Sequence, residues 1–125
     1  MDAPYERLIE LCERLHGASE TGQAVWEASH DTAFSWVGAS GSVGVRSLDS
    51  DGEEPFELTV FGPGGQKVET LTSEWADDEK PAPWNAPLGR LYRAARRQAL
   101  GVDKILDDLF AELPKVPAGA GLRSA

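Results

Sequence analysis

Two short groups of residues carry the side chains that chemistry would need. His30 and Asp31 are neighbours, with Ser29 and Ser35 close by, and an imidazole oriented by a carboxylate could act as a general base toward a hydroxyl. Side chains of adjacent residues diverge, so we expect a surface turn capped by Asp31. Cys12 falls on the apolar face of a predicted helix, where a thiol packs as a small core residue.

Metal and phosphate sites are also not expected. Asp49, Asp51, Glu53 and Glu54 offer oxygen ligands for a hard cation, but they lack the spacing and the closing glutamate of a calcium loop. The glycine-rich run 62–65 lies between two predicted strands, whereas a phosphate loop would open a helix. The sequence therefore predicts a protein that is not an enzyme and carries no metal or cofactor.

The arginines near the C-terminus are the first candidate binding residues. Residues 86–113 place basic side chains in their first half and acidic ones in their second half, against the preference set by a helix dipole. Three explanations compete: the arginines cover the acidic body of the same chain, they meet the acids of a second copy, or they bind phosphate or nucleic acid. The partner-binding arginines are Arg90, Arg93, Arg96 and Arg97.

The tryptophans are the second candidate. Each indole is large and carries one N–H that needs an acceptor, so tryptophans in loops usually hold those loops onto the sheet. The alternative is a tryptophan-lined groove for a peptide or an apolar ligand. We take Trp36, Trp75 and Trp84 as candidate partner-binding residues.

These side chains must be positioned by helices and strands that the hydrophobic pattern predicts. Residues 3–16 repeat apolar side chains at helical spacing. Residues 42–48, 56–61 and 67–72 alternate as strands joined by turns, with residues 25–29 as a fourth candidate. Residues 30–36 allow either a turn into a further short strand or a single helical turn. We expect an α+β fold: an N-terminal helix, an antiparallel meander of three to four strands and a long C-terminal helix. Both helices should lie on one face of the sheet.

The last helix carries the sharpest pattern. Apolar residues from Leu88 to Leu113 alternate spacings of four and three, which is typical of a helix-packing seam. Gly101 lies inside this segment, so the helix either runs through it or kinks there into two shorter helices, and the unbroken seam favours a continuous helix. A continuous helix over 86–113 would be about 42 Å long and would overhang so small a body. We therefore predict a homodimer that forms through this helix, with two copies antiparallel. The predicted core comprises Leu8, Cys12, Leu15, Phe56, Leu58, Val60, Tyr92, Leu106 and Leu109.

Composition sets the class of protein. With 125 residues and a net charge of −9, we expect one domain over residues 1–113 and a flexible tail over 114–125. Residues 1–85 hold 17 acidic and 5 basic side chains, which disfavours nucleic acid and anionic membranes as partners. The polar N-terminus favours a soluble cytoplasmic protein, and the preference for arginine and alanine over lysine suggests a bacterial one.

These patterns favour one function over another. We expect a non-enzymatic protein-interaction module, of an accessory, chaperone-like or immunity/antitoxin-like kind, that acts through its surfaces on a protein partner. The alternative is a sensor domain that binds a small molecule or peptide in a groove lined by tryptophans.

Overall fold

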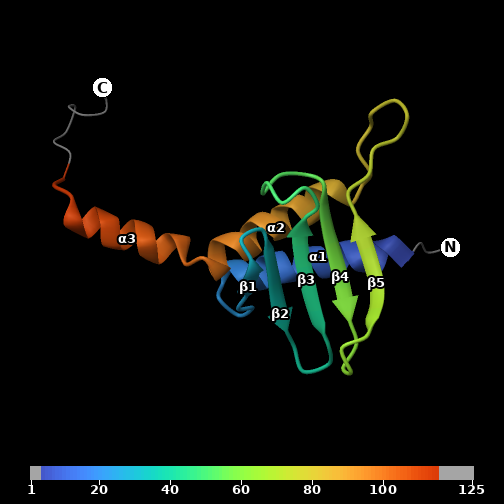
Figure 1. Cartoon of the computed structure of the whole chain (residues 1–125), viewed down its shortest axis with the longest axis horizontal. Helices are drawn as coiled ribbons and strands as arrows, with labels where there is room; N and C mark the ends of the chain where they lie inside the picture. Colours follow the sequence, from blue (N-terminus) through green and yellow to red (C-terminus); the bar gives the residue numbers. More distant parts are fainter. Residues whose placement is uncertain (1–3, 116–125) are drawn as a thin grey trace.

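The structure is a computed structural model that describes residues 4–115 (Figure 1). The predicted C-terminal tail lies outside the described residues from position 116 onward. The elements follow the chain as α1 (Pro4–Glu20), β1 (Glu27–His30), β2 (Ala33–Val37), β3 (Ser42–Ser47), β4 (Phe56–Phe61), β5 (Lys67–Thr72), α2 (Asn85–Ala99) and α3 (Val102–Glu112).

The sheet has five strands in the order in which they occur in the chain, and every neighbouring pair is antiparallel. The α+β class and the meander are confirmed, but the expectation of three to four strands is too low. The additional strand is β2, formed by a stretch whose sequence also allowed a helical turn. Phe34 lies opposite Val45 in β3, and Trp36 lies opposite Val43, so pairing with β3 decides its conformation.

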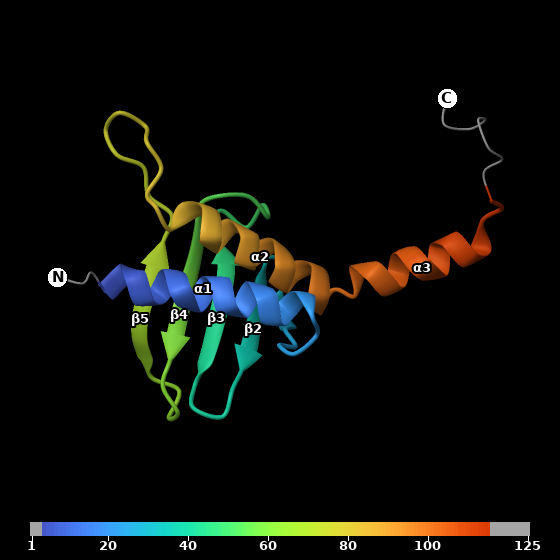
Figure 2. The ribbon, with the colours of Figure 1, turned by 180° about the vertical axis from the view of Figure 1, so that it is seen from behind.

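Helices α1 and α2 run side by side across one face of the sheet, as predicted (Figure 2). Alternate residues of β3 and β4 point toward them, and this pattern buries Val43 and Val45 in β3 and Phe56 and Leu58 in β4. Within residues 4–115, no helix covers the opposite face of the sheet (Figure 1).

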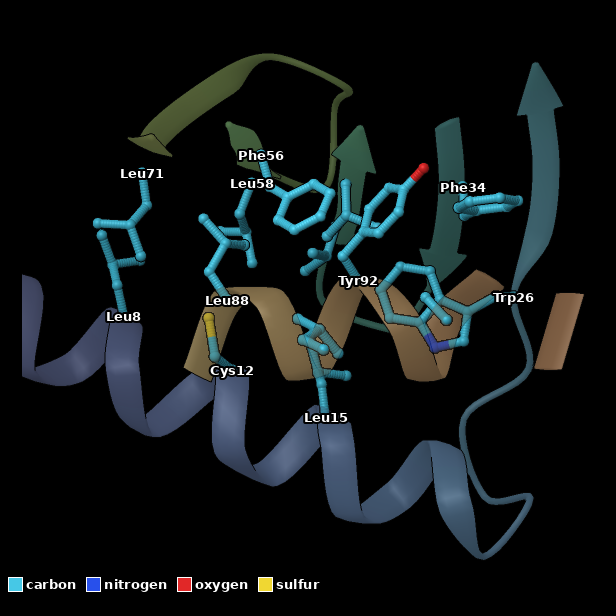
Figure 3. Packing of buried hydrophobic residues seen from close by; sticks show 14 of the residues in the cluster. Leu8, Cys12, Leu15, Trp26, Phe34, Phe56, Leu58, Leu71, Leu88 and Tyr92 are labelled. Atoms are coloured by element: carbon cyan, nitrogen blue, oxygen red, sulfur yellow. The ribbon is translucent and has the colours of Figure 1, made fainter. Parts of the chain in front are cut away.

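Tyr92 lies at the centre of the core (Figure 3). Its ring stacks on Phe56, with 4.2 Å between the ring centroids, and meets Phe34 at 5.6 Å in a tilted arrangement. Its hydroxyl donates a hydrogen bond to the Thr32 carbonyl oxygen at 3.0 Å. Burial of the ring raises the pKa of the Tyr92 hydroxyl. One side chain from α2 thus ties together β2, β4 and the turn before β2.

The predicted core is correct for the body and wrong for the C-terminal segment. The six buried members are Leu8, Cys12, Leu15, Phe56, Leu58 and Tyr92, and Val60 is half-buried. Leu106 and Leu109 are instead 36% and 45% exposed. They belong to α3, which has no buried residue and points away from the body (Figure 1).

The prediction of one long C-terminal helix is also wrong, because the chain turns at Gly101. That glycine has φ +64° and ψ +39°, a left-handed conformation that costs a residue with a side chain free energy. Helix α2 therefore ends at Ala99 and α3 begins at Val102. The seam from Leu88 to Leu113 is shared by two helices, and only the α2 part lies over the sheet.

Among residues 4–115, no helix is long and apolar enough to cross a membrane.

Replacing one leucine from each half of the seam should separate the two environments. Leu88→Ala should lower the free energy of unfolding by about 2–5 kcal/mol, because Leu88 is fully buried beneath α2. Leu106→Ala should lower it by less than about 1 kcal/mol in dilute protein. Urea denaturation of both variants measures the difference, and equal losses would mean that α3 is packed in a core.

Candidate functional site

The four candidate arginines lie on the outer side of α2. The helix buries Leu88, Leu91, Tyr92 and Ala95 against the body, which turns the remaining positions to solvent. All four arginines are exposed and line one surface hollow of about 640 Å³. We call this the arginine hollow. The structure therefore brings together Arg90, Arg93, Arg96 and Arg97 as the sequence predicted.

Acidic and apolar groups complete the arginine hollow. Asp51 and Glu53 line it from the β3–β4 loop, and His16 and Glu20 line it from α1. Its apolar lining is Tyr92, Ala94 and Val102. Sequence reasoning missed these neighbours, because only the fold brings α1 and the β3–β4 loop beside α2.

Most of the arginine charge has no close carboxylate. Among residues 4–115, only Arg97 of the four forms an ion pair, from Nη2 to Asp103 Oδ1 at 2.6 Å. The guanidinium carbon of Arg93 lies 5.7 Å from the centroid of the Phe56 ring, within range of a cation–π contact. Asp103 lies outside the acidic body of residues 1–85, so among residues 4–115 no ion pair within 4.0 Å joins these arginines to that body, as the first of the three explanations would require.

Asp51, an acid of the arginine hollow, is hydrogen-bonded within its own loop and to β3. Its carboxylate accepts hydrogen bonds from the Glu53 backbone N–H at 2.9 Å and from the Ser47 hydroxyl at 3.1 Å. The backbone bond is the main cause that lowers the pKa of Asp51. This acid is thus engaged in holding the β3–β4 loop.

The bend at Gly101 accounts for part of the charge order that looked inverted in the sequence. Arg96 and Arg97 lie in the last turn of α2, and Asp103 lies in the first turn of α3. Bases near a helix C-terminus and acids near a helix N-terminus are both favourable. Asp108 and Glu112 still lie toward the C-terminus of α3, where the dipole does not favour them.

Helix α3 presents an apolar stripe between two rows of acids. The acids Asp103, Asp107, Asp108 and Glu112 flank the stripe at helical spacing, and Lys104 pairs with Asp108 at 2.7 Å. Among the large apolar side chains of α3, Phe110 is the most exposed, at 66%. The apolar stripe consists of Val102, Ile105, Leu106, Leu109, Phe110 and Leu113. The sequence pattern predicts Leu106 and Leu109 in the core and the seam as a whole in a helix-packing contact, and the turn at Gly101 is what separates these residues from the body.

The candidate tryptophans are dispersed rather than grouped. Trp36 is half-buried in β2 on the side that faces the helices. Trp84 precedes α2, donates from Nε1 to the Thr72 carbonyl oxygen at 2.7 Å and stacks on Tyr5 with ring centroids 4.4 Å apart. Trp75 is 46% exposed in the loop before α2. Tryptophan side chains line none of five surface hollows over residues 4–115, so no tryptophan-lined groove is seen among them.

The fourth tryptophan fixes the start of the sheet. Trp26 is 2% exposed, and its Nε1 donates to the Ser19 hydroxyl at 2.8 Å. Its backbone N–H donates to Gln98 Oε1 at 2.7 Å. These bonds tie the segment before β1 to both α1 and α2, the holding role expected for a loop tryptophan.

His30 and Cys12, the residues with catalytic potential, lie in different parts of the structure. His30 is exposed at the end of β1, beside a shallow hollow that Arg46 and Ser47 also line. Cys12 lies beneath α1 with no exposed surface. Within residues 4–115, no three His, Cys, Asp or Glu side chains converge as metal ligands.

No family model matches the chain, and neither a curated protein nor a solved structure matches it.

The Cys12 thiol should be inert in the folded protein. Burial, with a smaller effect from Glu13, raises its pKa to about 12, and disulfide exchange requires the thiolate. At pH 8 we expect reaction with an aromatic disulfide reagent to be at least about 100-fold slower in buffer than in concentrated urea. Cys12→Ser provides the background absorbance, and equally fast reaction in both solvents would contradict the burial.

Proposed function

We propose that this protein is a non-enzymatic protein-interaction module whose docking element is α3. The observation that carries the proposal is an amphipathic helix that buries none of its residues in its own chain. Ile105, Leu109 and Phe110 are 52%, 45% and 66% exposed on this one short helix. Contiguous exposed apolar surface of this kind marks interaction sites in soluble proteins.

The energetics of a short helix support the same conclusion. Isolated helices of fewer than about 12–15 residues are marginal in water, and α3 has 11 residues. Packing of an amphipathic face normally supplies the missing stability. A surface that accepts the apolar stripe would provide this packing, as when an amphipathic helix binds in a groove of its partner.

The arginine hollow supplies a second contact area on the same end of the molecule. Val102, the first residue of α3, lines this hollow, so the docking helix and the arginines are adjacent. A partner that contacts both would meet apolar and charged groups together. Arginine and aromatic residues are enriched at protein interfaces, which supports a protein as the partner.

Photo-crosslinking from α3 in the native cells tests this function. A benzophenone amino acid in place of Phe110 lies on the apolar stripe and should form covalent adducts with the partner, identified by mass spectrometry. The matched control places the same amino acid at Ala111, which is also exposed but lies on the other side of α3.

Adducts from position 110 in clear excess over those from position 111 are the expected result. The absence of adducts from both positions, in cells that contain the folded protein, would contradict docking through α3. Equal adducts from both positions would mean that contacts are not directed by the apolar stripe.

A further inference from the structure

The chain's own surfaces indicate which protein surface accepts α3. This inference rests on the proposed function, in which the apolar stripe docks on a protein. The occupant should present basic groups beside apolar ones, since acids flank the apolar stripe of α3. The described part of this chain presents four arginines beside Ala94 and Val102 in the arginine hollow.

The four arginines of the hollow are opposite in charge to the acids of α3, and they outnumber the three acids, Glu20, Asp51 and Glu53, that also line the hollow. Helix α3 carries four acids and one lysine over its 11 residues. The outer side of α2 carries four arginines, of which Arg90, Arg93 and Arg96 have no described carboxylate within 4.0 Å. By contrast, two α3 helices packed directly on each other would bring two acidic surfaces together, which is unfavourable.

The lengths also correspond. Arg90 to Arg97 extends about 11 Å along α2, and Asp103 to Glu112 extends about 14 Å along α3. Helix α3 leaves the body near the end of α2 and points outward (Figures 1 and 2). A second copy related by a twofold axis near Gly101 would place each α3 along the α2 of the other copy, antiparallel to it.

The arginine hollow can accept the apolar stripe as well as the acids. The half-buried Ala94 and Val102 give the hollow accessible apolar lining, and arginine side chains bury their methylene stems while the guanidinium remains outside. Phe110 is the most exposed of the large apolar residues of α3, and its ring offers a face on which guanidinium groups can stack.

We infer that the occupant of the arginine hollow is α3 of a second copy of this chain, in a symmetric dimer in which the two copies exchange this contact. The single long antiparallel helix pair expected from the sequence is thereby replaced by two shorter contacts, each between α2 of one copy and α3 of the other.

Light scattering of the purified full chain, over a wide concentration range at low salt, tests this dimer. We expect a species of twice the chain mass that dissociates at lower concentration and more readily at high salt. Arg90→Glu with Arg93→Glu should raise the dissociation constant at least about tenfold. Asp107→Arg with Glu112→Arg should do the same, and all four substitutions together should return it to within about threefold of the wild-type value.

The control reverses two arginines elsewhere. Arg7→Glu with Arg14→Glu changes the net charge equally on the exposed side of α1 and should leave the dissociation constant unchanged. Thermal unfolding of each variant, followed by circular dichroism, verifies that it is folded. A dimer that the charge reversals do not weaken, or that the fourfold variant does not restore, would overturn the assignment of the arginine hollow.

A wild-type chain that stays monomeric at every concentration would overturn the dimer altogether. The proposed function would then stand or fall separately, on the adducts from position 110. Adducts with a different protein would support docking through α3 and exclude a second copy as its partner. If the chain instead dimerises, adducts between two copies from position 110 would support both the proposed function and the dimer.

Discussion

An amphipathic helix needs an apolar surface, and the apolar face of this sheet is shared by α1 and α2. Tyr92 sets how α2 uses that face, because its ring stacks on Phe56 and its hydroxyl bonds to the carbonyl before β2. Once this ring is inside, the positions of Arg90, Arg93 and Arg97 on the outer side follow from the helical repeat. The same packing leaves no described part of the sheet for α3, so its apolar side chains remain in water.

Much of the body could be predicted from the sequence because each element has a strong local pattern. The strict alternation of residues 56–61 gave β4 correctly, and the spacing of Leu8, Cys12 and Leu15 gave the buried face of α1. Strand β2 could not be predicted, because Ala33–Val37 becomes extended by pairing with β3 rather than by its own preference. Such pairing depends on residues that are distant in sequence, which local propensity does not contain.

The C-terminal segment shows how two correct observations can be combined wrongly. The apolar spacing from Leu88 to Leu113 is unbroken, and it suggested one helix. The charge order contradicted a single dipole, and Gly101 offered a place to divide it. A left-handed glycine removes part of this contradiction, because Arg96 and Arg97 then lie at the C-terminus of α2 and Asp103 at the N-terminus of α3. The arginines were correctly grouped, whereas their acidic and apolar neighbours depend on tertiary structure.

The connection between α2 and α3 contains only Leu100 and Gly101. A link this short does not behave as a flexible tether, because it leaves few backbone torsions to be fixed when α3 binds. The proposed docking would therefore lose little conformational entropy in the link itself, which is an advantage of preorganisation. The short link also restricts which partner surfaces α3 can reach, because it fixes how far the helix extends from the body. An acceptor surface must come within about 16 Å of the end of α2, the full length of an 11-residue helix, so bulky partners with recessed binding sites are excluded by reach alone.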